Sequence, residues 1–270
     1  MSMVEIALLY YQRMTEMNTK RYIFDVDGTL TPSRSRMNTE FALWFSKFCD
    51  SHDVYLVTGS DRKRTIDQLG EELYNKCTRV YQCAGNDVWE KDVNIRTSSM
   101  DIPADMLSTL EDIERNSAFE HRTGDHMDRR PGLINFSVLG KGATTQQRAD
   151  YYRWDNAIME RAYMVHVLAT AYGDEYDIAI AGDTGIDITR KNSSKKQVLT
   201  DFSDDDIIHF YGDNMYAGGN DRELALEVLA RGDIAISVDD WVHTWSLLEI
   251  HLNDRSGKST IGTRFYPFTK

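Results

Sequence analysis

Two aspartates, Asp25 and Asp27, stand one residue apart directly after the apolar run Tyr22-Ile23-Phe24. A buried strand that ends there places Asp25 at the carboxyl end of a sheet, where open α/β folds hold their ligands. Two carboxylates ~4 Å apart repel each other by roughly 4 kcal/mol at an effective dielectric constant of ~20. A site that tolerates them holds a cation, a shared proton or both. The chemistry that fits is a nucleophilic carboxylate, Asp25, beside a second acid, Asp27, that moves protons.

Further polar residues follow other predicted strands along the chain. Thr58 follows the apolar run 54–57, and Asp213 follows the run 207–211. Because the carboxyl ends of parallel strands meet at one edge of a sheet, we expect these side chains to gather there. One carboxylate at a strand end means little, whereas acids, a hydroxyl and a lysine in sequence predict a shared site. In chain order the candidates are Asp25, Asp27, Thr58, Lys195, Asp213 and Asp221.

The elements that must position these residues alternate between strand and helix. An apolar face on residues 38–50, with Phe41, Phe45 and Phe48 in register, predicts a helix after the first strand. Such alternation is typical of a parallel sheet wrapped by helices, so we expect an α/β core. The expected strands are 21–26, 54–57, 80–83, 207–211 and 233–238, and the expected helices are 38–50, 61–70, 195–202, 221–231 and 240–251.

The pattern changes in the middle of the chain, where strands and helices predict an inserted α+β module with an antiparallel sheet. We expect a discontinuous core over residues 1–97 and 190–270, with residues 1–20 as an extension, and a cap over residues 98–189. The cap is expected to contain a helix at 103–115, a charged loop at 120–132, a strand at 133–138, one long helix at 145–171, and strands at 176–181 and 186–189.

Composition narrows the classes of protein. The net charge of −12 argues against nucleic acid as a partner, because phosphate backbones attract basic surfaces. Three cysteines without a CxxC pair suit packing roles in a reducing cytosol, so we expect a cytoplasmic location. The apolar run 6–11 is too short for a signal peptide core or a membrane span, and we expect no membrane partner.

Four motifs occur in a fixed order. Phe24–Arg34 reads FDVDGTLTPSR, Thr58–Asp61 reads TGSD, Arg130–Asn135 reads RPGLIN, and Ile208–Asp213 precedes Gly218-Gly219-Asn220-Asp221. Their order resembles that of the haloacid dehalogenase superfamily of phosphoryl-transfer enzymes, and their detail resembles the eukaryotic-type phosphomannomutase family. The resemblance implies a doubly wound, haloacid dehalogenase-like parallel-sheet core with an inserted α+β cap.

The resemblance also implies roles for the core residues. Asp25 is the nucleophile that becomes aspartyl phosphate, and Asp27 is the acid/base whose backbone carbonyl binds Mg²⁺. Lys195 holds the transferring phosphoryl group, and Lys196 is the alternative for that role. A magnesium ion and a lysine offset the repulsion between carboxylates and phosphate. The implied residues of this site are Asp25, Asp27, Asp213 and Asp221 for the metal, Thr58 and Lys195 for the phosphoryl group, and Gly59 for binding of the substrate.

A second group of residues matches family positions that grip the distal phosphate and the sugar hydroxyls. Two departures from the family pattern stand out. Lys141 replaces an arginine, which keeps the charge but loses bidentate geometry, and Gly185 replaces a serine, which removes a hydroxyl. The matched positions are Arg34, Arg130, Lys141, Arg148, Gly185 and Asp187.

These residues lead to one function and two alternatives. We expect Mg²⁺-dependent phosphoryl transfer on a hexose phosphate, best assigned as the interconversion of mannose 6-phosphate and mannose 1-phosphate, with hexose 1,6-bisphosphate as intermediate or activator. A sugar-phosphate phosphatase would share the first step and use water as the second acceptor. A non-catalytic binding protein would retain the fold alone. The resemblance further implies a homodimer formed through the cap.

Overall fold

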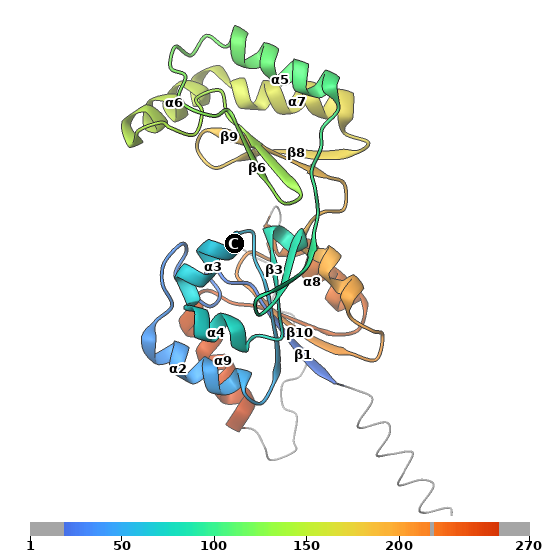
Figure 1. The fold of residues 1–270 in the computed structure, drawn as a ribbon. Helices are drawn as coiled ribbons and strands as arrows, with labels where there is room; N and C mark the ends of the chain where they lie inside the picture. The colour runs from blue at the N-terminus through green and yellow to red at the C-terminus, as the bar shows by residue number, and fades with distance from the viewer. Residues whose placement is uncertain (1–18, 217–218, 254–270) are drawn as a thin grey trace, which may run out of the picture. The chain divides into compact units, whose positions relative to one another are not determined.

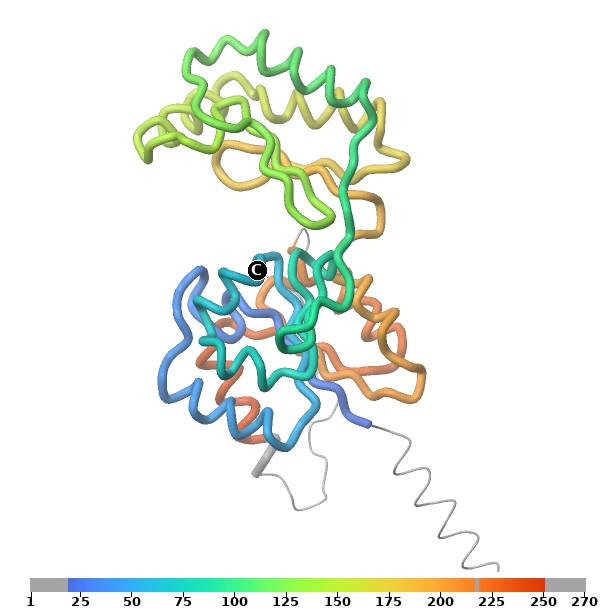
Figure 2. The backbone as a smooth tube through the Cα atoms, in the orientation of Figure 1, coloured from blue at the N-terminus to red at the C-terminus, as the bar shows by residue number. Residues whose placement is uncertain are grey.

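The computed structural model describes residues 19–216 and 219–253. The predicted extension over residues 1–20 therefore lies almost wholly outside the described residues. The chain divides into two compact units, one formed by Met1–Arg96 with Ser194–Lys270 and the other by Thr97–Ser193. Figure 2 shows segments from the two ends of the sequence side by side in the first unit, where the first strand pairs with a strand at Ile207–Gly212.

The first unit is built on a seven-stranded sheet with the order β11-β10-β1-β2-β3-β4-β5. Its five strands from β11 to β3 pair in parallel, and β4 then returns antiparallel to β3. The strands are β1 (Lys20–Phe24), β2 (Asp53–Val57), β3 (Arg79–Gln82), β4 (Asp87–Glu90), β5 (Val93–Thr97), β10 (Ile207–Gly212) and β11 (Ile234–Ser237).

Helices cover both faces of this sheet (Figure 1). Successive β1 side chains point to opposite faces, so Phe24 packs in one buried cluster and Ile23 in the other. The first cluster receives Phe41 and Leu73 from helices, and the second receives Val198. The helical elements of this unit are α2 (Thr39–Cys49), α3 (Arg62–Leu69), α4 (Glu71–Lys76), η1 (Cys83–Gly85), η2 (Lys195–Asp201), α8 (Arg222–Ala230) and α9 (Trp241–Asn253). The predicted doubly wound α/β core is confirmed.

Local chemistry explains where several of these helices begin. The Asn38 side chain accepts hydrogen bonds from the backbone N–H groups of Glu40 and Phe41, which caps α2. Asp61 caps α3 in the same way through Arg64 N, as its position after the second strand predicts. The predicted helix over 195–202 forms as a single 3₁₀ segment, η2. All three cysteines are free and buried.

The second unit contains a four-stranded antiparallel sheet with the order β6-β7-β9-β8. This sheet and its helices confirm the predicted α+β cap. Its core includes the buried side chains of Ile134, Phe136, Tyr151, Ile186 and Ile188. The elements are α5 (Ala104–Asn116), β6 (Met127–Arg130), β7 (Leu133–Phe136), α6 (Thr145–Ile158), α7 (Glu160–Tyr172), β8 (Tyr176–Ala181) and β9 (Gly185–Arg190).

The prediction of one long helix over 145–171 is wrong. The helix ends at Ile158, Met159 adopts a left-handed conformation with φ 63°, and α7 begins at Glu160. The break is held by Asp155, which is buried and accepts hydrogen bonds from the Arg161 backbone N (2.8 Å) and Nε (2.7 Å). Ile158, the last residue of α6, is 59% exposed.

The charged loop predicted at 120–132 is also partly wrong, because β6 lies inside it. The four residues of β6 are Met127, Asp128, Arg129 and Arg130, a composition that gives no alternating hydrophobic signal. The strand exists because it pairs with β7, which the sequence does predict. Helix α4 and strands β4 and β5 were likewise not predicted. No helix among the described residues is long and apolar enough to cross a membrane.

Candidate active site

Asp25 lies at the carboxyl end of β1, the middle one of the five parallel strands of the core sheet. Its backbone N–H donates to the carbonyl of Tyr211 on β10 (2.9 Å), which extends the pairing of the two strands by one residue. The side chain is buried, and the Thr29 hydroxyl donates to Oδ2 at 3.4 Å. Burial raises the pKa of Asp25 to about 7, although Lys195 opposes the shift. The Asp25 carboxylate is therefore largely removed from water, and a carboxylate in such a place can act as a nucleophile at neutral pH.

Lys195 is the cation that faces Asp25. Its Nζ donates to Asp25 Oδ1 at 2.6 Å and to Asp221 Oδ1 at 2.7 Å, and the side chain is only 2% exposed. Burial alone would lower the pKa of Lys195, but the two carboxylates outweigh it and raise that pKa above its ordinary value. Lys196 instead lies 3.4 Å from Glu223 on the surface of the unit. The geometry therefore favours Lys195 over Lys196 as the lysine of the site.

Three carboxylates gather at this edge of the sheet. Oxygen atoms of Asp25, Asp213 and Asp221 lie within 4.8 Å of one another, and Asp25 and Asp221 are buried. The close approach requires glycine in the first loop, because a Cβ at Gly28 would lie 2.4 Å from Asp213 Oδ2 and φ is +86°. Carboxylate oxygens are the ligands that Mg²⁺ prefers, so the donor set fits a divalent cation. The strand ends that are far apart in sequence do converge.

The Asp27 side chain is held by a different set of partners. Its Oδ1 accepts hydrogen bonds from the Arg34 backbone N (2.6 Å) and Gln68 Nε2 (2.9 Å), and its Oδ2 accepts from Ser60 Oγ (3.3 Å). Arg34, whose N–H donates to this carboxylate, adopts φ 56°. The Asp27 carboxylate is therefore fixed by neutral donors beside the cluster formed by Asp25, Asp213 and Asp221.

Thr58 and Gly59 follow β2 at the same edge of the sheet. Thr58 is buried, its backbone N–H donates to the Tyr81 carbonyl, and its Oγ1 accepts from Ser60 N at 3.1 Å. A Cβ at Gly59 would meet no atom within 4 Å, so this backbone faces open space. The turn after β2 can thus present a hydroxyl and exposed peptide groups to an anion.

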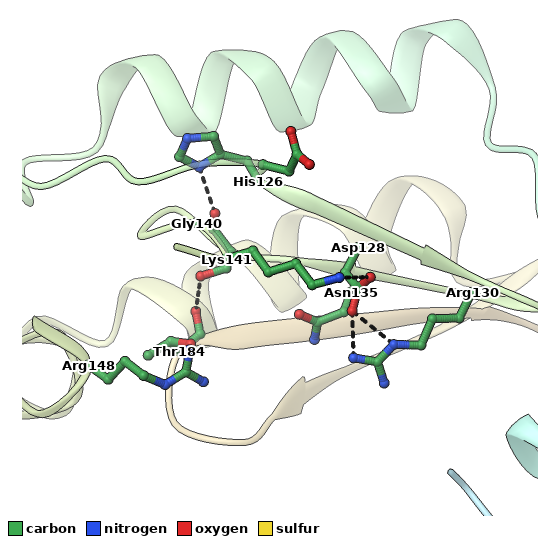
Figure 3. A pocket seen from close by; sticks show the side chains of 10 residues that line it. His126, Asp128, Arg130, Asn135, Gly140, Lys141, Arg148 and Thr184 are labelled. Atoms are coloured by element: carbon green, nitrogen blue, oxygen red, sulfur yellow. Dashed lines mark hydrogen bonds and ion pairs between the residues drawn. The ribbon is translucent and has the colours of Figure 1, made fainter. Parts of the chain in front are cut away.

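The second unit holds a separate polar pocket of about 220 Å³ (Figure 3). Three predicted cations line it: Arg130 from β6, Lys141 from the turn after β7, and Arg148 from α6. Asp128 accepts hydrogen bonds from Arg130 (Nη2 at 2.6 Å) and from Lys141 (Nζ at 2.6 Å). The full lining is Asp125, His126, Asp128, Arg130, Asn135, Ser137, Gly140, Lys141, Arg148 and Thr184.

The remaining predicted residues lie outside this lining. Arg34 belongs to the first loop of the core unit and is exposed. Gly185 begins β9, and a Cβ there would lie 2.9 Å from the Asn135 amide, so a serine would displace Asn135. Asp187 accepts a hydrogen bond from Asn135 Nδ2 at 2.7 Å, and burial raises the pKa of its carboxyl.

Several residues at these two places were missed. Thr29 contacts Asp25, and Gln68 contacts Asp27; Thr29 stands in the first quoted motif, and neither residue had a role assigned to it. Asp128 was placed in a loop, although an acid two positions before a predicted cation could have indicated an ion pair. The sequence patterns indicate Asp25, Asp27 and the cations, but they do not indicate the neutral side chains or the carboxylate of Asp128 that orient these groups.

The sheet order and the inserted antiparallel cap define a haloacid dehalogenase-like fold. The fold is similar to that of a haloacid dehalogenase-like hydrolase from Bacteroides thetaiotaomicron, with a TM-score of 0.56 and 12% identity, covering 87% of this chain and 100% of that chain.

The family within this class follows from sequence comparison. The model of the eukaryotic phosphomannomutase family matches residues 42–248. A phosphomannomutase from Galdieria sulphuraria is 25% identical over 244 residues, which cover 86% of this chain and 96% of that protein. One from Saccharomyces cerevisiae is 27% identical over 233 residues, which cover 82% and 90%. The chain belongs to the eukaryotic phosphomannomutase family, a family of enzymes, as the motifs predicted.

Proposed function

We propose that this protein is a Mg²⁺-dependent phosphotransferase that interconverts mannose 6-phosphate and mannose 1-phosphate through a phosphorylated Asp25. The observation that carries the proposal is the buried lysine between two carboxylates: Lys195 Nζ lies 2.6 Å from Asp25 and 2.7 Å from Asp221. Family membership supports the choice of sugar phosphate, since the relatives named above are phosphomannomutases.

In the first half-reaction, an Asp25 carboxylate oxygen attacks the phosphorus of a hexose bisphosphate. A bond from Asp25 to phosphorus forms, the bond from phosphorus to the sugar oxygen breaks, and Asp27 gives its proton to that oxygen. In the second half-reaction, Asp27 takes the proton of a sugar hydroxyl, and the oxygen of that hydroxyl attacks the phosphorus of phospho-Asp25. The bond from the sugar oxygen to phosphorus forms, the bond from Asp25 to phosphorus breaks, and Asp25 is regenerated as a carboxylate. The hydrogen bonds from Gln68 and Ser60 hold Asp27 in one orientation for both proton transfers.

Polar groups around the transferred group come from the start of η2 and from the end of β2. Lys195 offsets negative charge on the phosphoryl oxygens, and the Thr58 hydroxyl and the Gly59 peptide lie at the neighbouring strand end. Asp25, Asp213 and Asp221 form the carboxylate cluster that would hold Mg²⁺, with the Asp27 carbonyl as a further ligand. When bound, the ion neutralises developing charge on the phosphoryl group.

We assign the second unit to recognition of the rest of the substrate. A mutase must accept a phosphate at either end of the sugar, so it needs cations away from the nucleophile. The pocket supplies Arg130, Lys141 and Arg148 in an otherwise acidic protein. Arg148 makes no side-chain hydrogen bond or ion pair within the described ranges, so its guanidinium is available to a phosphate.

A coupled assay tests the proposal. Purified protein with mannose 1-phosphate, a trace of hexose 1,6-bisphosphate and Mg²⁺ should form mannose 6-phosphate, whereas Asp25→Asn should form none because an amide cannot take the phosphoryl group. Release of inorganic phosphate without isomerised sugar would replace the mutase with a phosphatase. A parent protein no more active than Asp25→Asn in either assay would refute both enzymes and leave a binding protein.

A further inference from the structure

A row of hydrogen-bond acceptors crosses the sheet of the second unit. Asp128 on β6 is paired in register with Asn135 on β7, and Asn135 is paired with Asp187 on β9. Residues paired across neighbouring strands project from the same face of a sheet. Asn135 donates one hydrogen bond to Asp187, and Asp128 and Asn135 both line the pocket. Carboxylates and amide oxygens in a row are acceptors for the hydroxyl groups of a polyol.

Asp128 also forms ion pairs with two of the cations that line the pocket, Arg130 and Lys141. It binds Arg130 through Nε (2.9 Å) and Nη2 (2.6 Å) and binds Lys141 through Nζ (2.6 Å). Its side chain is 18% exposed, whereas those of Arg130 and Lys141 are 44% and 62% exposed. Partial burial opposes ionisation of Asp128, but the two cations outweigh it and lower the pKa of this carboxyl. Asp128 is therefore ionised at neutral pH and occupies both cations in the free protein (Figure 3).

We propose that Asp128 is a specificity-determining residue that makes the pocket select a polyhydroxy phosphate over a bare oxyanion. A phosphate that binds Arg130 and Lys141 must displace Asp128 from them. A sugar phosphate brings hydroxyl donors that give the displaced carboxylate new hydrogen bonds. Sulfate brings none and leaves two anions facing each other. This inference rests on the proposed function and adds to it the group that discriminates between ligands.

The test compares mannose 1-phosphate with inorganic sulfate on the full chain. Dissociation constants for both are measured by calorimetry on the parent protein, on Asp128→Asn, which keeps the shape and removes the charge, and on Asp128→Glu, which restores the charge. In Asp128→Asn, sulfate should bind about threefold to tenfold more tightly because its cations are released. The preference for mannose 1-phosphate should fall by at least about the same factor, and Asp128→Glu should recover it.

Two further variants locate the effect. Asp177→Asn removes an exposed carboxylate on β8 that pairs with Lys191, and it should change neither constant. Adding Arg130→Ala and Lys141→Ala to Asp128→Asn should abolish the gain in sulfate binding, because these are the two cations that Asp128 holds, and this result would place the gain in the pocket. If the parent isomerises mannose 1-phosphate but Asp128→Asn keeps the parental preference, the inference fails alone. If the parent neither binds nor turns over mannose 1-phosphate, the proposed function fails and the inference fails with it.

Discussion

Replacement of Lys195 by methionine should destabilise the core in a way that depends on pH. Methionine has nearly the length of lysine, so it fills the space and removes the charge. Asp25 and Asp221 would then be two buried carboxylates without a cation, with 5% and 0% of their side chains exposed. Breaking a buried ion pair in this way costs about 3–5 kcal/mol of unfolding free energy.

The sign of the pH dependence follows from the protons that the folded state binds. Lys195 opposes the upward shift in the pKa of Asp25, so without Lys195 burial and the neighbouring carboxylates raise the folded-state pKa of Asp25 further above its unfolded value. The folded variant then binds more protons than the folded parent, so its stability falls more steeply as pH rises. The loss relative to the parent should therefore be larger at pH 8 than at pH 6.

The assay is urea unfolding followed by circular dichroism at both pH values, with turnover of mannose 1-phosphate measured in parallel. Turnover by Lys195→Met should fall by at least about 100-fold, the cost of removing one preorganised electrostatic group. Lys196→Met is the matched control, because Lys196 and Glu223 are both partly exposed and contribute ~0–1 kcal/mol. Equal stability and equal turnover in the two variants, or a loss that does not change with pH, would refute this account of the site.

Two other predictions concern the same molecule. In metal-free protein, the carbonyl band of Asp25 should titrate near pH 7, because burial raises the pKa of this carboxyl to about 7. Added Mg²⁺ should lower the pH at which the band titrates, because a cation favours the charged form. A difference infrared spectrum against Asp25→Asn measures the band, and a band that titrates near pH 4 without metal would contradict the burial argument. In the second unit, Asp155→Ala should cost about 3–5 kcal/mol because it leaves the buried Arg161 guanidinium unpaired; urea unfolding measures it against Asp150→Ala, which removes an exposed partner of Arg153 and should cost under about 1 kcal/mol.

Elements with strong local signals were predicted from the sequence. The run at β1 and the aromatic face of α2 are clear hydrophobic patterns, and Asp61 is a clear boundary residue at the start of α3. An element with a weak local signal was not predicted: β6 is a strand only through its pairing with β7. The single helix expected over 145–171 failed for another reason. Nothing in the periodicity shows that Asp155 would bind Arg161 and end the helix at Ile158.

The sequence by itself determined which reactive side chains this protein has and their order along the chain. Acids and a hydroxyl at successive strand ends must meet at one edge if the sheet is parallel, because parallel strands share the direction of their carboxyl ends. Only the tertiary structure decided which of two adjacent lysines enters the buried cluster, since Lys195 and Lys196 differ in nothing but the direction that η2 gives them. Likewise, only the pairing of β6 with β7 places Asp128 between Arg130 and Lys141, because Lys141 lies 13 residues away in the chain.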